Sequence, residues 1–221
     1  MRRRFSLLVG ISIIMTCSWV AAQDYKFEIN GRIGYTFSEG VNVTPVEYLG
    51  SEITKVGPSS GFNYGIGFDY YMTEQFSAGF TWSRQLSKLK AKIRGLEGVE
   101  FTNMGVGNYH FILTYNFFDE GEYLRPYVFG GLGVTHHGPD NVQGFSVNGA
   151  TMFSTTWGGG VKYYTTDHLG FKAGLRWTPT FIGSDPDGIY CSSYWTWSCF
   201  VVDDSNYSHQ FELSAGIIVR F

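Results

Sequence analysis

Hydrophobic and polar residues alternate along much of the chain, with a period of two residues. In the segment 207–221 the odd positions are apolar or aromatic apart from His209, and most of the even positions are polar. A β-strand turns successive side chains to opposite faces, whereas an α-helix repeats about every 3.6 residues. The pattern therefore predicts a strand with one apolar face, and this strand ends on an aromatic residue, Phe221.

Seven further segments alternate in the same way. The segment near 125–136 is the least regular: Val128, Leu132 and Val134 share one face, and Tyr127 and Phe129 share the other. Its proline is compatible with a strand only at the start, where a missing N–H donor does little harm. The seven segments are 25–37, 62–70, 76–82, 108–117, 125–136, 153–163 and 169–177.

The connections between these eight segments alternate in length. Short turns are expected near 71–75, 118–123 and 165–168, and long connections near 39–59, 86–98, 135–150 and 182–206. Outer-membrane barrels show this asymmetry, with short periplasmic turns and long surface loops. The chain is therefore predicted to be all-β, an eight-stranded antiparallel up-and-down transmembrane β-barrel. A soluble lipocalin-type barrel is the rival fold, and it would bury its apolar residues inside.

The N-terminus predicts export. Arg2, Arg3 and Arg4 precede an apolar stretch from Phe5 to Cys17, and small residues follow at 20–22. This order is typical of a secretory signal peptide, whereas a spanning helix needs about 20 apolar residues. We predict a signal peptide over residues 1–22 and a barrel domain over 23–221, located in the outer membrane.

Composition agrees with an exported barrel. Residues 23–221 carry 13 basic and 19 acidic residues, a net charge of −6 that gives no reason to expect nucleic acid. Aromatic residues make up 18% of the chain, which also has 29 glycines but no later apolar run long enough for a helical span. Cys191 and Cys199 remain after removal of the leader, and in an oxidising compartment they are expected to form a disulfide.

Three motifs carry a resemblance to a known family. The stretches 125–134 (RPYVFGGLGV), 157–171 (WGGGVKYYTTDHLGF) and 206–221 (NYSHQFELSAGIIVRF) resemble the outer membrane protein β-barrel domain family of OmpA/OmpX-like small barrels. The resemblance implies assembly by the outer-membrane insertion machinery, which would read the final strand with Phe221. OmpA itself adds a peptidoglycan-binding domain after its barrel, and that role is not expected here.

The polar strand faces predict a lumen filled with charge. An eight-stranded barrel is just wide enough to be filled by side chains, so no open channel is expected. Arg32, Arg176 and Glu212 fall at similar heights, and we expect Glu212 to lie between the two planar guanidiniums. A structural plug and a gated ion path both remain open. The predicted core comprises Lys26, Glu28, Arg32, Asp69, Lys162, Lys172, Arg176, Glu212 and Arg220.

Two long connections have features of their own. Lys88, Lys90, Lys92 and Arg94 alternate with apolar residues, so an extended hairpin would present a basic strip to lipopolysaccharide phosphates. A solvated hairpin face is an equal alternative, and Leu86, Leu89, Ile93 and Leu96 also have the spacing of a short amphipathic helix. The disulfide would close a ring holding Tyr194, Trp195 and Trp197, either as a binding surface or as a cap on the barrel mouth.

Catalysis is not expected. A nucleophile needs a base within hydrogen-bond reach, and Ser208 and His209 are adjacent on a strand and point to opposite faces. His136 and His137 are placed in a surface loop without a partner serine. We expect a monomeric, non-enzymatic barrel without cofactor or metal, with an envelope-structural or surface-interaction role. The alternatives are an OmpW-like narrow pathway for small apolar compounds and, less favoured, a lipid A-modifying enzyme.

Overall fold

The structure is a computed structural model that describes residues 26–48, 51–93, 99–118, 122–139, 149–182, 189–192, 198–200 and 207–221. Among these residues, no helix is long and apolar enough to cross a membrane. The predicted leader, residues 1–22, lies outside the described part. The strands are β1 Phe27–Ser38, β2 Val41–Tyr48, β3 Ser51–Pro58, β4 Gly61–Tyr71, β5 Phe76–Ile93, β6 Val99–Asn116, β7 Leu124–Pro139, β8 Ala150–Tyr164, β9 Leu169–Phe181, β10 Ile189–Ser192, β11 Ser198–Phe200 and β12 Tyr207–Arg220.

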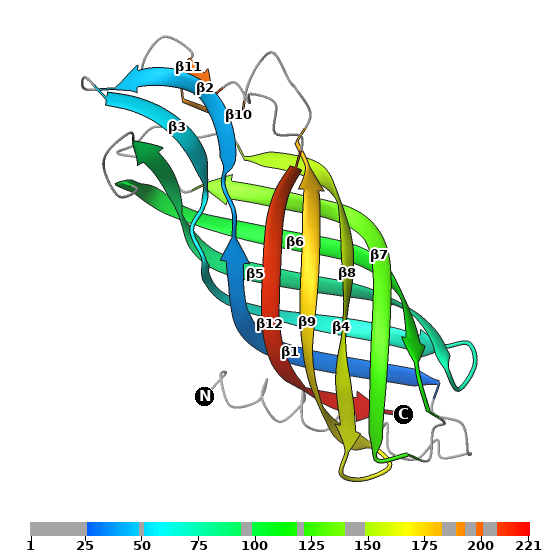
Figure 1. The fold of residues 1–221 in the computed structure, drawn as a ribbon. Coiled ribbons are helices and arrows are strands. Elements are labelled where there is room, and N and C mark those ends of the chain that lie inside the picture. Colours follow the sequence, from blue (N-terminus) through cyan, green and yellow to red (C-terminus); the bar gives the residue numbers. More distant parts are fainter. Residues whose placement is uncertain are drawn as a thin grey trace, which may run out of the picture.

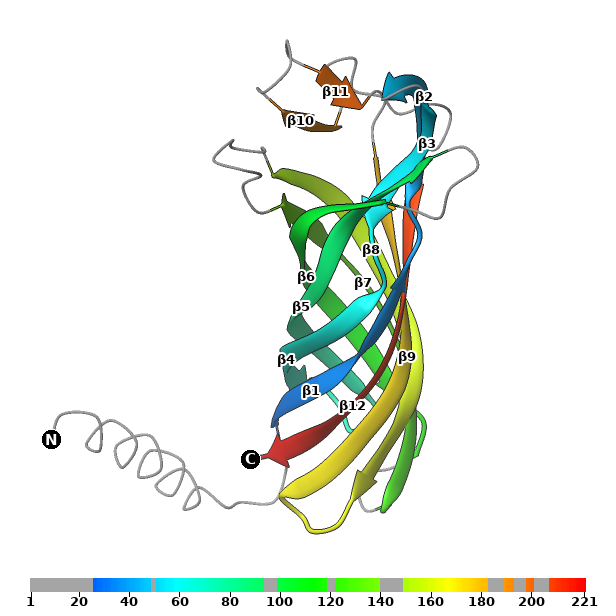
Figure 2. The same cartoon turned by 90° about the vertical axis from the view of Figure 1, so that its left-hand side faces the viewer.

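Eight of the strands close an antiparallel barrel, which confirms the predicted fold. Around the wall the order is β1, β4, β5, β6, β7, β8, β9 and β12, and β12 pairs with β1 to complete the circle (Figure 1). Short turns join β4 to β5 and β8 to β9 at one end, here called the short-turn end. The opposite end, which carries β2, β3, β10 and β11, is called the long-loop end (Figure 2).

The wall is apolar outside and polar inside. On β4 the exposed side chains are Phe62, Tyr64, Ile66, Phe68 and Tyr70, and Asn63 and Asp69 between them are buried. Exposing such a wall to water would cost about 25 cal/mol for each Å² of apolar surface, whereas acyl chains solvate it. The lipocalin-type alternative requires the reverse arrangement and is excluded.

The predicted connection at 39–59 contains two more strands. β2 and β3 continue the β1–β4 hairpin beyond the barrel, and β3 also pairs with the upper part of β5. Short interruptions at 39–40 and 59–60 change which side chains face inward: even positions face inward in β1, but Val41 is buried in β2. Such one-residue slips are typical of bulged strands. Figure 2 shows the hairpin curving over the long-loop end.

The second long connection is an extended hairpin, as predicted. β5 runs to Ile93 and β6 begins at Val99, so Leu86 and Leu89 lie in a strand and the amphipathic helix is wrong. Leu96 and Arg94 lie outside the described residues. In the last long connection, β10 pairs with β11, with Ser192 opposite Ser198. Cys191 and Cys199 therefore lie on neighbouring strands, but their side chains are outside the described part and the disulfide stays a prediction.

The first and last barrel strands meet at the short-turn end. Phe27 and Phe221 exchange two backbone hydrogen bonds of 3.0 Å. Their rings stack outside the barrel with centroids 6.1 Å apart. Phe221 therefore belongs to the lower aromatic girdle and closes the β1–β12 seam.

Candidate functional site

The lumen is the most highly organised part of the barrel, and its lowest layer is centred on one carboxylate. Glu28 on β1 and Lys162 on β8 form an ion pair of 2.9 Å, with side chains 0% and 1% exposed. The hydroxyls of Tyr71 and Tyr164 donate to the Glu28 carboxylate at 2.7 and 3.0 Å, and Lys162 also donates to the Tyr71 oxygen at 2.9 Å. A buried charge is tolerated only when it is paired and hydrogen-bonded, and here it is both.

Two arginines close the short-turn end beside this layer. The guanidinium of Arg125, at the start of β7, donates to the carbonyls of Glu74 at 2.6 Å and Phe118 at 3.0 Å, so it ties two turns together. The Arg220 guanidinium lies 3.6 Å from the centre of the Tyr164 ring, a close cation–π contact. The predicted core omitted Arg125, which is the second residue of β7 and lies at the barrel rim.

The middle layer brings together the three residues that the sequence grouped. Arg32 Nε lies 3.3 Å from Glu212 Oε1, and both side chains are buried. Arg176 is directly opposite Glu212 in the β9–β12 pairing. Because β12 lies between β1 and β9, Glu212 is flanked by the strands that carry the two guanidiniums. Arg176 also donates to Thr81 at 3.4 Å.

Two of the remaining predicted core residues, Lys172 and Asp69, are at least partly buried, whereas Lys26 is not. Lys172 is half-buried with its ammonium 4.6 Å from the Tyr127 ring centre, and Asp69 is buried and accepts a hydrogen bond from Asn30 at 3.3 Å. Lys26 is exposed, so its predicted place in the core is wrong. It lies at the short-turn end, just before the first residue of β1, although its backbone carbonyl accepts a hydrogen bond from the Tyr71 N–H at 2.8 Å.

A third layer, of neutral polar groups, was not predicted as a unit. Thr135 donates to Asn108 Oδ1 at 2.7 Å, its hydroxyl oxygen lies 2.9 Å from the Ser154 hydroxyl, and Thr180 donates to Thr135 at 3.2 Å. His110 Nε2 lies 2.9 Å from the Ser154 hydroxyl. A serine–histidine pair needs a third group to orient the ring, but among the described residues nothing bonds to His110 Nδ1. His110 and Ser154 are both buried.

Of the other histidines, His136 and His137 differ from expectation and His209 does not. His136 and His137 lie within β7 and not in a loop; His136 is exposed, and His137 is buried because it faces the lumen. Ser208 is buried and donates to the Glu39 carbonyl at 3.0 Å. His209 is on the opposite face, with its ring 5.9 Å from Trp177 and 6.4 Å from Tyr207. Ser208 and His209 therefore do not meet, as the strand geometry predicted.

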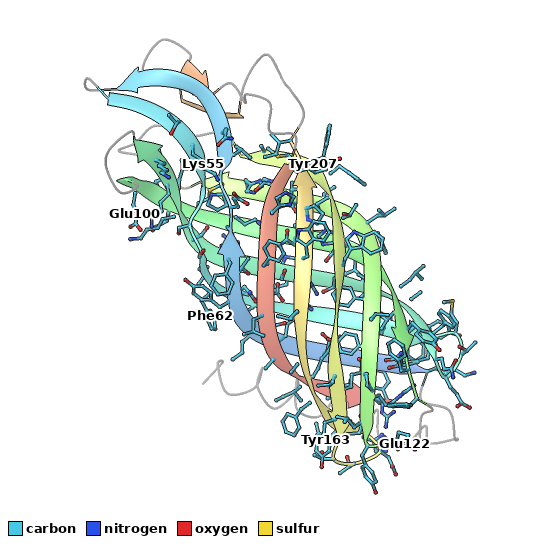
Figure 3. The ribbon with its side chains drawn as sticks, in the orientation of Figure 1. Lys55, Phe62, Glu100, Glu122, Tyr163 and Tyr207 are labelled. Atoms are coloured by element: carbon cyan, nitrogen blue, oxygen red, sulfur yellow. The ribbon has the colours of Figure 1, made fainter. Side chains whose placement is uncertain are left out.

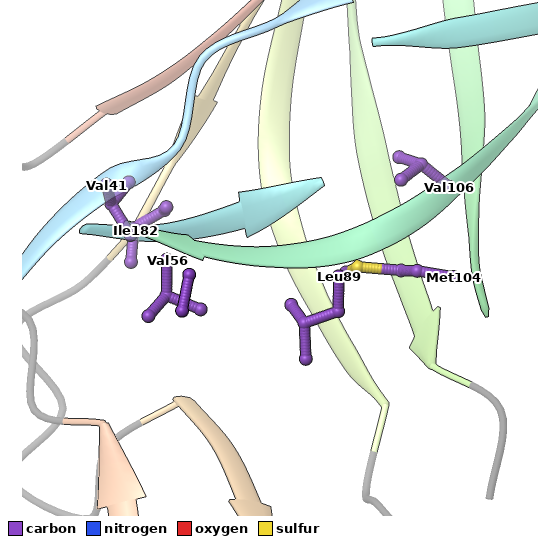
Figure 4. Packing of buried hydrophobic residues seen from close by; sticks show 7 residues of the cluster. Val41, Val56, Leu89, Met104, Val106 and Ile182 are labelled. Atoms are coloured by element: carbon purple, nitrogen blue, oxygen red, sulfur yellow. The ribbon is translucent and has the colours of Figure 1, made fainter. Parts of the chain in front are cut away.

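The uppermost layer of the lumen is apolar. Inward-facing side chains from β2, β3, β5, β6 and the end of β9 form a buried cluster at the long-loop end (Figure 4). The sequence reading missed this layer because Leu89 and Ala91 were placed on a hairpin standing clear of the barrel. Its members are Val41, Val56, Leu89, Ala91, Met104, Val106 and Ile182, with Met152 packed against them.

A cavity at mid-height, lined by Arg32, Thr81, Tyr127, Lys172 and Arg176 among others, offers about 20 Å³ to the centre of a water molecule. A single water needs about 10–15 Å³ by this measure, so the cavity admits one or two waters.

The pairing of β8 with β9 in the wall is interrupted at a seam. β8 and β9 pair at Ser154–Thr180 and again from Trp157–Trp177, and the intervening Pro179 has no N–H to donate. On the outside near this seam is a hollow of about 500 Å³. It is lined by Phe37, Trp157, Gly158, Gly159, Leu175, Arg176, Trp177, Phe211, Glu212 and Leu213.

The predicted basic strip lies on the outer face of β5. Lys88, Lys90 and Lys92 are exposed, while Arg94 is outside the described residues. Glu100 on β6 accepts from Lys88 at 2.6 Å and lies 3.7 Å from Lys90 (Figure 3). The hydrogen bond from Lys88 lowers the pKa of Glu100, so the carboxylate neutralises part of the strip at neutral pH.

Comparisons with known proteins agree with this architecture. The profile of the family described as "OprF membrane domain" matches residues 52–180. Outer membrane porin F of Pseudomonas fluorescens is 26% identical over 166 residues, which are 75% of this chain and 45% of that protein. The chain thus spans less than half the length of this relative.

Solved structures show the same fold at low identity. Neisserial surface protein A has a TM-score of 0.56 and 17% identity, with 88% of this chain and 97% of that chain covered. OprG of Pseudomonas aeruginosa has a TM-score of 0.56 and 16% identity, with 91% and 98% covered. The chain is a small outer-membrane β-barrel, so the short-turn end is periplasmic and the long-loop end extracellular.

Proposed function

We propose that this chain, which belongs to the OprF membrane domain family, is a closed, non-enzymatic barrel that supports envelope integrity or surface contact through its extracellular loops. The observation that carries the proposal is the stacked filling of the lumen. The ion-paired layer at Glu28, the arginine layer at Glu212, the polar layer at Thr135 and the apolar layer at Leu89 follow one another along the axis. Opening a path would require several layers to separate at once.

The name of one relative points toward a pore, so conductance is the decisive test. The folded protein should give no steady single-channel steps in planar bilayers at neutral pH. Heat-modifiable gel mobility of the same sample establishes that the barrel is closed and inserted. Reproducible ion-conducting steps from such a sample would overturn the closed-lumen proposal.

A second candidate function is a narrow pathway for small apolar compounds. It is favoured by the interrupted β8–β9 pairing and by the apolar hollow beside it, whose lining includes the two buried residues Arg176 and Glu212. Thr156 and Thr178 face the lumen across this seam, with hydroxyls 3.4 Å apart. A disulfide between these two positions would lock the seam.

The seam is tested with the variant Thr156→Cys/Thr178→Cys in proteoliposomes. The vesicles enclose a reporter that detects the entry of a small apolar dye. If the seam is a path, dye entry falls on oxidation and returns on reduction. The matched control is Ser83→Cys/Asn108→Cys, a facing inward pair in an uninterrupted part of the β5–β6 pairing. Equal entry before and after oxidation of the seam pair would remove this candidate.

A lipid-modifying enzyme is a third class, which the proposal excludes. Lipid A mass spectra from a deletion strain should match those of the parent strain. A missing acyl or phosphate modification, restored by the cloned gene, would contradict the non-enzymatic assignment.

A further inference from the structure

The outward face of β5 changes chemistry at one position. From the periplasmic end, its outward side chains are apolar or aromatic up to Trp82 and then become cationic, with Leu86 between the first two cations. Eight residues along β5 separate Phe76 from Arg84. At about 3.4 Å per residue and a tilt of about 40°, they rise about 21 Å, close to the top of an apolar band about 25 Å tall. Arg84 therefore lies at the boundary of the outer leaflet.

A hollow of about 520 Å³ opens on the wall at this height. Its shape depends on glycine: Leu86 of β5 is opposite Gly105 of β6, and a Cβ at residue 105 would lie 2.8 Å from Arg84 Nη2. The guanidinium thus lies over the bare backbone of β6. The hollow is lined by Ser59, Ser60, Arg84, Leu86, Ser87, Lys88, Glu100, Asn103, Met104 and Gly105.

The charges around the hollow are unbalanced. Arg84 is exposed and has no carboxylate partner in the described part of the chain. Glu100 is shared between Lys88 and Lys90, so one carboxylate faces three cations. Figure 3 shows Glu100 on the same side of the barrel as Phe62 and nearer the extracellular end. Positive charges therefore exceed negative ones around the hollow, and a ligand with at least one negative charge fits this arrangement.

We propose that the hollow binds a phosphate group of an outer-leaflet glycolipid, held by the Arg84 guanidinium and the Lys88 ammonium. The planar guanidinium donates two parallel hydrogen bonds to phosphate oxygens, and the ammonium supplies a second charge. Leu86, 53% exposed between them, packs against the apolar part of the same molecule. A lipid and not free phosphate is favoured because the site opens on the membrane-facing wall. The site is independent of whether the lumen conducts.

The test uses the purified, folded barrel in detergent micelles, titrated with bis-phosphorylated lipid A and read by native mass spectrometry in the presence of EDTA. Arg84→Gln/Lys88→Gln should weaken binding at least tenfold, since about 1.5–3 kcal/mol is typical of one charge-assisted hydrogen bond. Lys26→Gln removes an exposed charge at the periplasmic end and should leave binding unchanged. If Lys26→Gln weakened lipid A binding as much as Arg84→Gln/Lys88→Gln, the proposed site would be wrong.

Two further variants separate the site from general attraction to basic residues. Gly105→Val fills the hollow without changing charge and should weaken binding several-fold. Glu100→Gln releases Lys88 and Lys90 from their shared carboxylate and should strengthen it. Opposite or absent effects of this pair would contradict the proposal, provided that heat-modifiable mobility shows both variants folded.

The ligand itself provides the last comparison. Lipid A from which both phosphates have been removed should lose the part of its affinity that depends on Arg84. Undiminished binding of that lipid would show that phosphate is not recognised. Inorganic phosphate should compete only at concentrations far above those of the lipid, and competition at equal concentration would assign the site to free phosphate instead.

Discussion

At the scale of single residues, the chain stabilises charge where neither water nor lipid can solvate it. Glu28 receives donors from one lysine and two tyrosines, whereas the Arg32–Glu212 pair is longer, at 3.3 Å. Desolvation of a buried pair is offset only when nearly every lone pair is bonded. The Glu28 layer should therefore be the more sensitive of the two to loss of one partner.

Replacement of Glu28 by Gln should destabilise the barrel by about 3–5 kcal/mol, because Lys162 would be left charged and unpaired in the lumen. The measurement is urea-induced unfolding in phospholipid vesicles, followed by tryptophan fluorescence. The double variant Glu28→Gln/Lys162→Met should recover at least half of the loss. A single variant with unchanged unfolding would show that the pair does not stabilise the fold.

The sequence predicted well which residues face the lumen, but it predicted less well which of these residues contact one another. Alternation placed Glu28, Arg32 and Asp69 inward, and these residues are buried. It did not pair Glu28 with Lys162, because contacts across a barrel depend on the stagger between distant strands. Lys26 continues the inward-facing even positions of β1 by one step but is exposed, because it lies at the rim of the barrel and not within it.

At the scale of elements, the extracellular hairpin β2–β3 is joined to the barrel by the pairing of β3 with β5 and by an ion pair near the end of β1. Lys55 of β3 donates to Glu39, just beyond β1, at 2.9 Å. This hydrogen bond lowers the pKa of Glu39 below its ordinary value. The sequence did not predict the two strands because the interruptions at 39–40 and 59–60 each shift the alternation by one residue.

Acidification should loosen this hairpin slightly. A carboxylate with a lowered pKa contributes stability above its ordinary pKa, and the contribution is lost as pH falls through the lowered value. Because Glu39 is 60% exposed, the effect should stay below about 1 kcal/mol. Hydrogen exchange of β2 and β3 should accelerate at low pH in the natural chain, after correction for intrinsic rates. Glu39→Gln should abolish that difference, and an unchanged pH profile in this variant would contradict the assignment.

The β10–β11 hairpin leads to a prediction about covalent structure. Its two strands carry Cys191 and Cys199, and we expect these residues to be joined in the exported protein. Intact mass should lie about 2 Da below that of the reduced chain, with no thiol labelled before reduction. Labelling of both cysteines in freshly isolated outer membranes would show that the bond is absent.

At the scale of the whole molecule, the layers divide the lumen into a charged lower part and an apolar upper part. The lower part could be anticipated from the polar strand faces, because charged side chains of a membrane barrel are destabilising on the lipid-facing side and therefore face the lumen. The upper part could not, since it forms only where β2, β3, β5 and β6 rise above the membrane and face one another. The apolar layer therefore resembles the hydrophobic core of a water-soluble protein. It lies above a membrane-spanning part whose interior is polar and whose outer face is apolar.

Closure of the whole barrel should depend on Phe221. Phe221→Ser removes the ring that stacks on Phe27, and we expect a lower fraction of folded protein in the outer membrane. Ile217→Ser, another outward apolar position of β12 that is 52% exposed, is the matched control. Heat-modifiable mobility of membrane fractions measures both. Equal losses would indicate a general effect of lipid-facing polarity and not a role in assembly.

The β1–β12 seam also constrains the route to the native state. The hydrogen-bonded partners Phe27 and Phe221 are 194 residues apart along the chain. Bringing such distant ends together carries an entropic cost of about 5 kcal/mol by polymer statistics. Until they meet, the curved sheet has two unpaired edges, which readily recruit strands from other chains. Each newly exported chain therefore needs a chaperone that covers these two edges until the barrel closes.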